Sequence, residues 1–367
     1  MRVLVTGGAG YVGSHTVLRL LGAGHDVVVV DDFSRGVPAA LERVEILAGR
    51  PVPVHVFDGA DIDALERLFD TEGFDAVLHL AGIKSPSARG VRPLDSYETN
   101  LGTTFTLLRC MAWYGVDRLV VSSSAAVYGE GRDLPHAEDA PLAPTGPVGR
   151  SHAMNEQILR DVVADAGPAL RVGVVRHFSA AGAHPSGSLG PDRTGASASL
   201  LTAVAEAAAG LRDGLEVYGV DHPTPDGTTM RDYVHVDDLA AGHVAALAAL
   251  GDTEEQLSTW NLGSGRPTSV LELVRAFEAA TGRTVPYRVG ARREGDVAVS
   301  YADPARAEAE LGWSASRGIE DICLDLWRWH QRNPAGYPTS LAPSAPWRGG
   351  VGHRLRLVSA VPAAAAW

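Results

Sequence analysis

The chain has 367 residues, of which 45% are hydrophobic and 21% charged, with a formal net charge of −12. These values are ordinary for a core-forming protein of one large or two smaller domains. The acidic balance argues against a nucleic-acid binder, which needs a surplus of Lys and Arg. The two cysteines, Cys110 and Cys323, lack metal-ligand spacing, so we expect neither a disulfide framework nor a metal site. Without a signal peptide or an apolar run of about eighteen residues, we expect a cytoplasmic protein with no membrane span.

The first half of the chain alternates short apolar runs with stretches of helical length. The predicted strands are residues 2–6, 27–30, 52–57, 76–80, 119–122 and 170–175. The predicted helices are residues 14–21, 62–70, 93–114 and 150–164. Because the strands are almost wholly apolar, they suit a parallel sheet that is covered on both faces. The regular strand–helix order predicts an α/β protein with a doubly wound, extended Rossmann sheet.

The pattern is looser after Arg176, where Gly, Pro, Ser and His crowd residues 179–199 into a predicted loop. Two further helices are predicted at residues 200–209 and 269–281. We therefore expect a Rossmann domain over residues 1–175 and a smaller mixed α/β substrate lobe over 176–338, with the two interleaving after residue 176. Residues 339–367, rich in Ala, Pro and Gly, are expected to form a disordered tail. A ligand is expected between the two lobes.

A glycine-rich turn follows the first predicted strand and opens the first predicted helix. Gly7, Gly10 and Gly13 provide a tight turn, close approach of the backbone to a diphosphate, and close helix–strand packing. Asp31 follows the second strand, where a carboxylate accepts hydrogen bonds from adenosine ribose hydroxyls and repels a 2′-phosphate. The turn therefore predicts NAD rather than NADP, although Arg35 is placed to accommodate that phosphate. The alternative for Asp31 is that it ends a strand and caps a turn.

The spacing GxxGxxG resembles the extended short-chain dehydrogenase/reductases, and several other segments resemble the UDP-glucose 4-epimerase family in particular. The resemblance extends from residue 2 to about residue 338, in one collinear order. The segments are LAGIKS at 80–85, SSSAAVYG at 122–129, PHAE at 135–138, GAHPSG at 182–187, DHPTPDGTTMRDYVHVDDLAAGH from 221, NLGSG from 261, REGD at 293–296 and WHQRNPAGYP at 329–338.

This resemblance implies a nucleotide-sugar epimerase that uses tightly held NAD and a 4-keto intermediate to interconvert UDP-glucose and UDP-galactose. The residues that it places on NAD are Gly7, Gly10, Tyr11, Val12, Gly13, Asp31, Asp32, Ser34, Asp58, Leu80, Ala81, Gly82, Lys84, Asn100, Ser122, His152 and Phe178. Those that it places on the substrate are Lys84, Ser124, Ser179, Ser199, Leu200, Tyr218, Arg231, Arg293 and Asp296. The two arginines would bind the diphosphate, and Asp296 the uridine ribose. The resemblance also implies a homodimer through the helices at 93–114 and 150–164.

The sequence departs from this family where the chemistry takes place. The catalytic Tyr and Lys of the family's YxxxK motif correspond to Val148 and His152 in the segment PVGRSHAMNEQIL. Val148 has no titratable proton, whereas His152 titrates near neutral pH and lies one helical turn away on the same face. Ser124 retains the hydroxyl that would bond the sugar oxygen. The usual RYFN segment reads RHFS at residues 176–179, and Ser199 replaces a second asparagine of the family.

Three functions therefore remain open. The first is an epimerase whose proton relay uses Ser124 and His152. The second is an NAD-dependent enzyme of altered chemistry, such as a dehydratase or an enzyme for another nucleotide sugar, which the serines at 179 and 199 would suit. The third is a binder of NAD and a nucleotide sugar without turnover, which the loss of both Tyr and Lys favours. The role of His152 distinguishes the two enzyme functions from the binder, because a binder needs no titratable group at this position. The alternative for His152 is a packing role, which is the more common one for a lone histidine.

Overall fold

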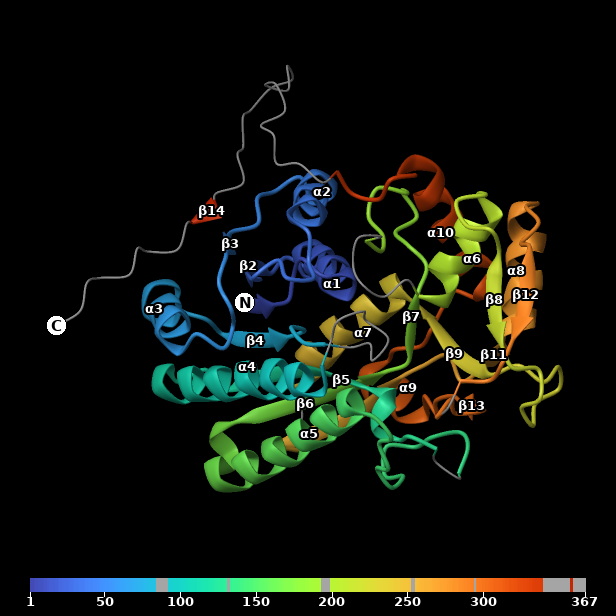
Figure 1. Cartoon of the computed structure of the whole chain (residues 1–367). Helices are drawn as coiled ribbons and strands as arrows, with labels where there is room; N and C mark the ends of the chain where they lie inside the picture. The colour runs from blue at the N-terminus through green and yellow to red at the C-terminus, as the bar shows by residue number, and fades with distance from the viewer. Residues whose placement is uncertain are drawn as a thin grey trace, which may run out of the picture.

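A parallel sheet with helices on both faces forms the centre of the molecule, as the computed structural model shows (Figure 1). The structure describes residues 1–83, 92–130, 133–192, 199–251, 255–293 and 295–338, and the backbone of 357–358. The strand order is β10-β6-β5-β4-β1-β2-β3-β14, and every neighbouring pair is parallel. This arrangement confirms the predicted Rossmann-type fold.

The six predicted strands of the first half are all present, with bounds that differ by a few residues. They are β1 (Arg2–Thr6), β2 (Asp26–Val30), β3 (Val54–His55), β4 (Ala76–His79), β5 (Arg118–Ser124) and β6 (Arg171–His177). The largest difference is at β3, which has two residues instead of the predicted 52–57. Pro51 and Pro53 lie beside it, and neither has an N–H to donate to a sheet.

The helices of the first half divide between the two faces of the sheet. They are α1 (Tyr11–Gly22), α2 (Pro38–Ala48), α3 (Ile62–Glu72), α4 (Pro93–Tyr114) and α5 (Pro147–Ala166). Val3 and Val5 of β1 belong to one buried cluster with α1, α2 and α7 (Val236–Ala249), whereas Leu4 belongs to another with α3, α4 and α5. This alternation along β1 is what a strand buried on both faces requires. The sequence predicted α1, α3, α4 and α5 but not α2. Helix α5 begins at Pro147, three residues before the predicted residue 150.

The residues after 176 form smaller, mixed sheets with their own helices, as predicted. One sheet joins β9 (Met230–His235) to β7 (Ser179–Ala181), β11 (Pro267–Ser269) and β13 (Val299–Ser300), with only the β11–β9 pair antiparallel. A second sheet pairs β8 (Leu215–Tyr218) with β12 (Tyr287–Gly290). The other elements are α6 (Leu200–Ala208), α8 (Val270–Thr281), α9 (Ala305–Leu311), α10 (Ile319–Arg332) and the short helices η1 (Ala125–Val127) and η2 (Gly167–Ala169).

Two elements from this later part of the chain return to the central sheet. Strand β10 (Leu257–Leu262) pairs with β6 at one edge, and its Trp260 is fully buried. Helix α7 contributes Leu239 and Ala246 to the buried cluster that α1 shares. The predicted tail lies outside the described residues, except for β14 (Leu357–Val358), which pairs with β3.

Candidate active site

The glycine turn between β1 and α1 leaves no room for a side chain at Gly7 or Gly13. A Cβ on Gly7, which has a φ of +72°, would lie 2.5 Å from the backbone nitrogen of Ala81. A Cβ on Gly13 would lie 2.0 Å from the carbonyl oxygen of Gly7. Helix α1 begins directly after this turn, with no side-chain cap at Gly10 and no acidic residue in its first turn. The exposed backbone N–H groups and the helix dipole therefore suit a diphosphate.

A cavity of about 380 Å³ opens beside this turn, at the carboxyl ends of the central strands. Nine predicted cofactor residues line it: Gly7, Gly10, Asp31, Asp32, Ser34, Asp58, Leu80, Ala81 and Gly82. Ligands of open α/β sheets bind at this edge, where the strand order changes direction. The cavity therefore has the position and lining that a dinucleotide needs.

Asp31 organises the loop around this cavity. Its carboxylate accepts hydrogen bonds of 2.9 Å from the backbone N–H groups of Ala9 and Phe33. Burial raises the pKa of the Asp31 carboxyl, and these two N–H donors act in the opposite direction. Asp32 is exposed and accepts from the N–H and hydroxyl of Ser34. Asp31 thus caps a turn, which was the alternative interpretation of this residue. It also lines the predicted cofactor cavity.

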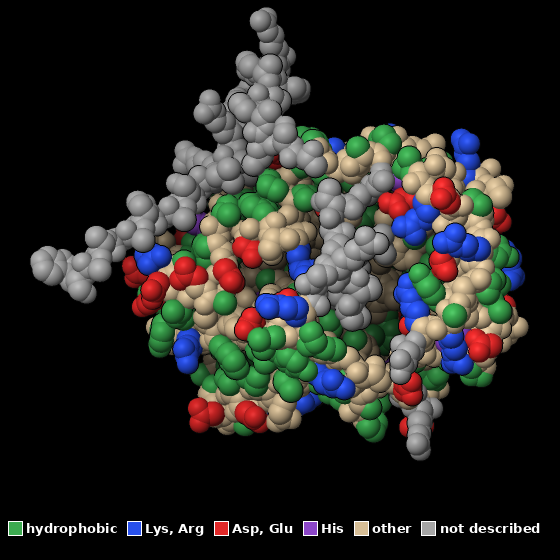
Figure 2. Space-filling view, in the orientation of Figure 1, with side chains coloured by type: hydrophobic (Ala, Val, Ile, Leu, Met, Phe, Trp, Pro, Cys, Tyr) green, Lys and Arg blue, Asp and Glu red, His purple; other side chains and the backbone are tan. Residues whose placement is uncertain are grey.

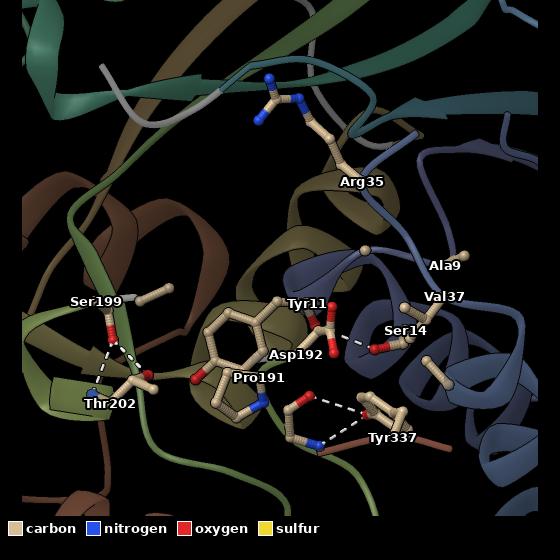
Figure 3. A pocket seen from close by; sticks show the side chains of 14 residues that line it. Ala9, Tyr11, Ser14, Arg35, Val37, Pro191, Asp192, Ser199, Thr202 and Tyr337 are labelled. Atoms are coloured by element: carbon tan, nitrogen blue, oxygen red, sulfur yellow. Dashed lines mark hydrogen bonds between the residues drawn. The ribbon is translucent and has the colours of Figure 1, made fainter. Parts of the chain in front are cut away.

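A second cavity, of about 180 Å³, adjoins the first, because Gly10 and Arg35 line both. In Figure 3, Tyr11 extends from the start of α1 between Asp192 on one side and Ser199 on the other. The Tyr11 hydroxyl donates a 2.6 Å hydrogen bond to the carbonyl oxygen of Gly182. The glycine turn is therefore continuous with the segment that carries the predicted substrate residue Ser199.

Ser124 and the start of α5 meet at short helix η1. Ser124 ends β5, and its hydroxyl accepts a 3.2 Å hydrogen bond from the N–H of Ala126. A Cβ on Gly149 would lie 2.4 Å from the carbonyl oxygen of Ala126, so the first turn of α5 packs directly on η1. Val148 and His152, on that part of α5, are only 2% and 4% exposed. Val148 and His152, which the resemblance aligns with a catalytic Tyr and Lys, therefore lie buried on the part of α5 that packs on η1, next to Ser124 in the chain.

Two buried polar contacts hold α5 in this place. The Glu156 carboxylate accepts a 2.7 Å hydrogen bond from the Ser123 hydroxyl and pairs with Arg176 at 2.7 Å. Burial alone would lower the pKa of Arg176, but the Glu156 carboxylate raises it overall. His152 lies one turn before Glu156 on the same face, which places it nearer the carboxyl ends of β5 and β6.

Asn100 has a positioning role that the sequence did not predict. Its side-chain oxygen accepts a 2.7 Å hydrogen bond from the N–H of Ile83, and its amide nitrogen donates to Ser151 at 2.8 Å. Asn100 thereby joins the segment after β4 to α5. The packing is close, because a Cβ on Gly82 would lie 2.8 Å from the side-chain oxygen of Asn100. Asn100 is predicted to contact the cofactor, and the contacts of its amide hold Ile83, which lines the larger cavity, against α5.

The two arginines predicted to bind the diphosphate differ in how deeply they are buried. Arg231 of β9 is half-buried, and burial lowers the pKa of its guanidinium, against which Tyr233 and Asp296 act. Arg293 is exposed and stacks on Tyr218, with its guanidinium carbon 3.6 Å from the ring centroid. The structure thus brings Arg231 near Asp296, and Arg293 onto Tyr218.

The remaining predicted residues differ in how they are held. Ser199 caps α6, accepting from the N–H of Thr202 at 3.2 Å, and Leu200 is the first residue of that helix. Ser179 begins β7, and the neighbouring Phe178 is buried against the Tyr128 ring. Ser122 is buried on β5, and Val12 and Gly13 lie in α1. Lys84, expected on both cofactor and substrate, lies outside the described residues.

Residues of α4 that sequence reasoning missed also line the larger cavity. They are Asp95, Thr99 and Thr103, which recur every four residues and so share one face of the helix. This polar stripe was the available signal. Within the described ranges, no group of three or more His, Cys, Asp and Glu side chains is placed to hold a metal ion. No helix in the same ranges is long and apolar enough to cross a membrane.

Comparison with known proteins gives the family. Residues 3–263 match the NAD dependent epimerase/dehydratase family. The chain belongs to this family. It is 46% identical to UDP-glucose 4-epimerase 2 of Arabidopsis thaliana, with 92% of this chain and 97% of the relative covered. It is 45% identical to UDP-glucose 4-epimerase of Bacillus subtilis, with 93% and 100% covered.

Solved structures agree with the sequence relatives. UDP-glucose 4-epimerase from Bifidobacterium longum, in complex with NAD+ and UDP, has a TM-score of 0.86 and 43% identity, covering 92% of this chain and 100% of that one. UDP-glucose-4-epimerase from Stenotrophomonas maltophila, with NAD and formylated UDP-arabinopyranose, has a TM-score of 0.87 and 41% identity, covering 91% and 99%. The likeness confirms the family resemblance that the sequence motifs gave.

Proposed function

We propose that this protein is an NAD-dependent UDP-glucose 4-epimerase. The observation that carries the proposal is the continuity of two cavities, one beside the glycine turn and one reaching Ser199, because a cofactor and a nucleotide sugar must lie end to end. The named relatives support it, since they match over nearly their whole lengths. Bound NAD would supply the chemistry of accepting a hydride from the sugar and returning it.

The residues of the glycine turn and of the cavity fit NAD. Uncapped N–H groups at the start of α1 would bind its diphosphate, and Asp31 would bind the adenosine ribose. Arg231 and Arg293 would neutralise the diphosphate of the UDP-sugar. Ser124 would hydrogen-bond the reacting sugar hydroxyl, and His152 would replace the titratable group that Val148 lacks.

The first experiment is turnover with UDP-galactose by the NAD-loaded protein, with products separated by chromatography and absorbance of reduced nicotinamide followed together. We expect UDP-glucose to appear. Accumulating reduced cofactor or a dehydrated product would instead indicate altered chemistry. Binding of NAD and UDP-galactose in calorimetry without any product would indicate a non-catalytic binder. His152→Ala should abolish conversion and leave NAD bound.

The protein is also proposed to be a homodimer through α4 and α5. Leu94, Phe105 and Trp113 of α4 are 57%, 44% and 58% exposed, and Met154 of α5 is 46% exposed. Figure 2 shows hydrophobic side chains gathered over this part of the molecule. Phe105→Glu should convert a dimer to a monomer in light scattering, whereas Leu211→Glu, at an apolar residue outside α4 and α5 that is 54% exposed, should not. A monomeric parent protein would exclude the dimer.

We place the protein in the cytoplasm. Both Cys110 and Cys323 are free, buried thiols, as is usual in a reducing compartment. Fractionation of cells followed by immunoblotting tests this, and recovery in a membrane or secreted fraction would contradict it.

A further inference from the structure

Ser151 lies on α5 between Val148 and His152, and it is completely buried. Its hydroxyl oxygen lies 2.8 Å from the backbone carbonyl oxygen of Val148 and 2.8 Å from the side-chain amide nitrogen of Asn100. Asn100 belongs to α4, which packs along α5 (Figure 1). Ser151 therefore joins α4 to the turn of α5 whose positions the resemblance aligns with a catalytic Tyr and Lys.

The donors and acceptors of this contact have one consistent assignment. The side-chain oxygen of Asn100 accepts from the backbone N–H of Ile83 at 2.7 Å, so the amide nitrogen is the end that faces Ser151. An amide nitrogen only donates, so the Ser151 hydroxyl oxygen accepts from it. The single hydroxyl proton of Ser151 is then donated to the Val148 carbonyl, which only accepts. The hydrogen bonds thus form one directed chain from Asn100 to Val148.

The other end of this chain is the wall of the larger cavity, which Gly82 and Ile83 line. Asn100 holds both backbone polar groups of Ile83, because its amide nitrogen also donates to the Ile83 carbonyl oxygen at 3.2 Å. Asn100, Ser151 and Ile83 are all buried, so water competes little for these bonds. A buried chain of hydrogen bonds therefore runs from the predicted cofactor cavity to the first turn of α5.

Asn155, one turn further along α5, provides a second link to the same residue of α4. Its side-chain amide nitrogen donates a 2.8 Å hydrogen bond to the backbone carbonyl oxygen of Asn100, and Asn155 is also buried. The Asn155 bond joins the two helices, whereas the Ser151 bonds join them through the carbonyl of Val148. The two links therefore separate holding α5 against α4 from holding its first turn.

We infer that Ser151 is a positioning residue of the epimerase, a role that rests on the proposed function. Through Asn100, it keeps the turn that carries His152 at a fixed distance from the wall of the cofactor cavity. Ser151 itself is buried and acts without touching the substrate. Transfer of a proton and a hydride depends steeply on such placement, because a displacement of about 1 Å can cost about 10²-fold in rate.

Ser151→Ala tests this role by kinetics with UDP-galactose. It removes the donor to Val148 and the acceptor for Asn100, and it should lower kcat about 10- to 100-fold with little change in KM or NAD affinity. Ser151→Cys keeps a weak donor and a weak acceptor, so it should recover part of the lost kcat. Asn155→Ala is the matched control, because it removes the other buried bond to Asn100 and should retain most of kcat. Urea denaturation establishes that all three variants are folded.

Hydrogen exchange gives a measurement that does not depend on turnover. In the NAD-loaded protein, Ser151→Ala should speed amide exchange over residues 148–152 and leave residues 159–163 of the same helix as slow as in the parent protein. Asn155→Ala should change the exchange of residues 148–152 much less. Unchanged exchange over residues 148–152 in Ser151→Ala would overturn the inference.

The outcomes distinguish the inference from the function beneath it. If the parent protein converts UDP-galactose and Ser151→Ala does so equally fast, the role of Ser151 fails and the epimerase stands. Equal losses of kcat in Ser151→Ala and Asn155→Ala would reduce Ser151 to a packing residue. If the parent protein binds UDP-galactose without converting it, the proposed function fails, and the catalytic role of Ser151 fails with it.

Discussion

The Tyr11 hydroxyl and the Gly182 carbonyl oxygen, 171 residues apart in sequence, are joined by a 2.6 Å hydrogen bond. Tyr11 is the first residue of α1, so this bond ties the glycine turn to the segment that follows β7. Burial raises the pKa of the Tyr11 hydroxyl, which therefore stays protonated and remains a donor. The wall of the predicted cofactor site is thus shared by two distant parts of the chain.

Removing this hydroxyl should weaken the fold. Tyr11→Phe leaves the Gly182 carbonyl without its donor, and we expect the free energy of unfolding to fall by about 1–3 kcal/mol. Urea denaturation measures it, with Tyr114→Phe, at a partly exposed tyrosine, as a control that should change little. Equal losses in the two variants would mean that the bond to Gly182 contributes nothing specific.

Asp31 should control cofactor binding. Asp31→Asn removes a charge and leaves one amide nitrogen that cannot accept from Ala9 or Phe33. We expect NAD affinity in calorimetry to fall about tenfold or more, which corresponds to about 1.4 kcal/mol. Asp32→Asn, at the exposed neighbour, should have the smaller effect. Unchanged NAD affinity in Asp31→Asn would remove this residue from the site.

The Glu156–Arg176 pair should be a strong determinant of stability. Both side chains are 2% exposed, so Glu156→Gln leaves a buried guanidinium without its counter-charge. We expect a loss of about 3–5 kcal/mol in the free energy of unfolding. Arg160, which pairs with the same carboxylate but is 40% exposed, provides the comparison. Arg160→Gln should cost less than about 1 kcal/mol, and similar losses would contradict the assignment.

His15 should make stability depend on pH below neutrality. It is fully buried, and burial lowers its pKa from 6.5 to about 4. Because the unfolded state binds the proton more tightly, stability is full above pH 6.5 and falls as the pH drops towards 4, by on the order of 3 kcal/mol. The shifts of His136 and His184 have the same sign. Denaturation of His15→Gln across this range should show a shallower decline, and an unchanged slope would exclude His15.

Restoring the family motif should require two substitutions. Val148→Tyr alone should raise kcat little, because a buried phenol keeps a high pKa without a cation beside it. Val148→Tyr with His152→Lys should raise kcat by more than the sum of the two single changes. Kinetics on all four proteins measures this coupling. Additive effects would show that the two positions do not act together.

The central sheet was readable from the sequence because its strands are short, apolar and separated by helices. Strand β3 was overestimated, since its prolines limit the pairing, and β10 was missed because it joins the sheet from residue 257 onwards. Helix α2 was missed too, although Pro38 at its start and Gly49 at its end are ordinary helix boundaries.

The cofactor side of the site was predictable because one local segment, the glycine turn, specifies it. The bond from Tyr11 to Gly182 and the pairing of Ser124 with His177 were not, because each depends on strands and loops brought together by the fold. Asn100 was assigned to the cofactor by resemblance, and only the structure shows that its amide connects Ile83 to Ser151.

The close approach of Gly149 to the Ala126 carbonyl has a practical consequence for redesign. Any side chain larger than hydrogen at 149 would push α5 away from η1, so the backbone there accepts only one docking position. Residues installed at 148 or 152 would start from this fixed backbone position, although both sites are buried and a larger side chain must displace its neighbours. The protein is therefore a ready scaffold in which alternative proton donors can be exchanged at a fixed point beside Ser124.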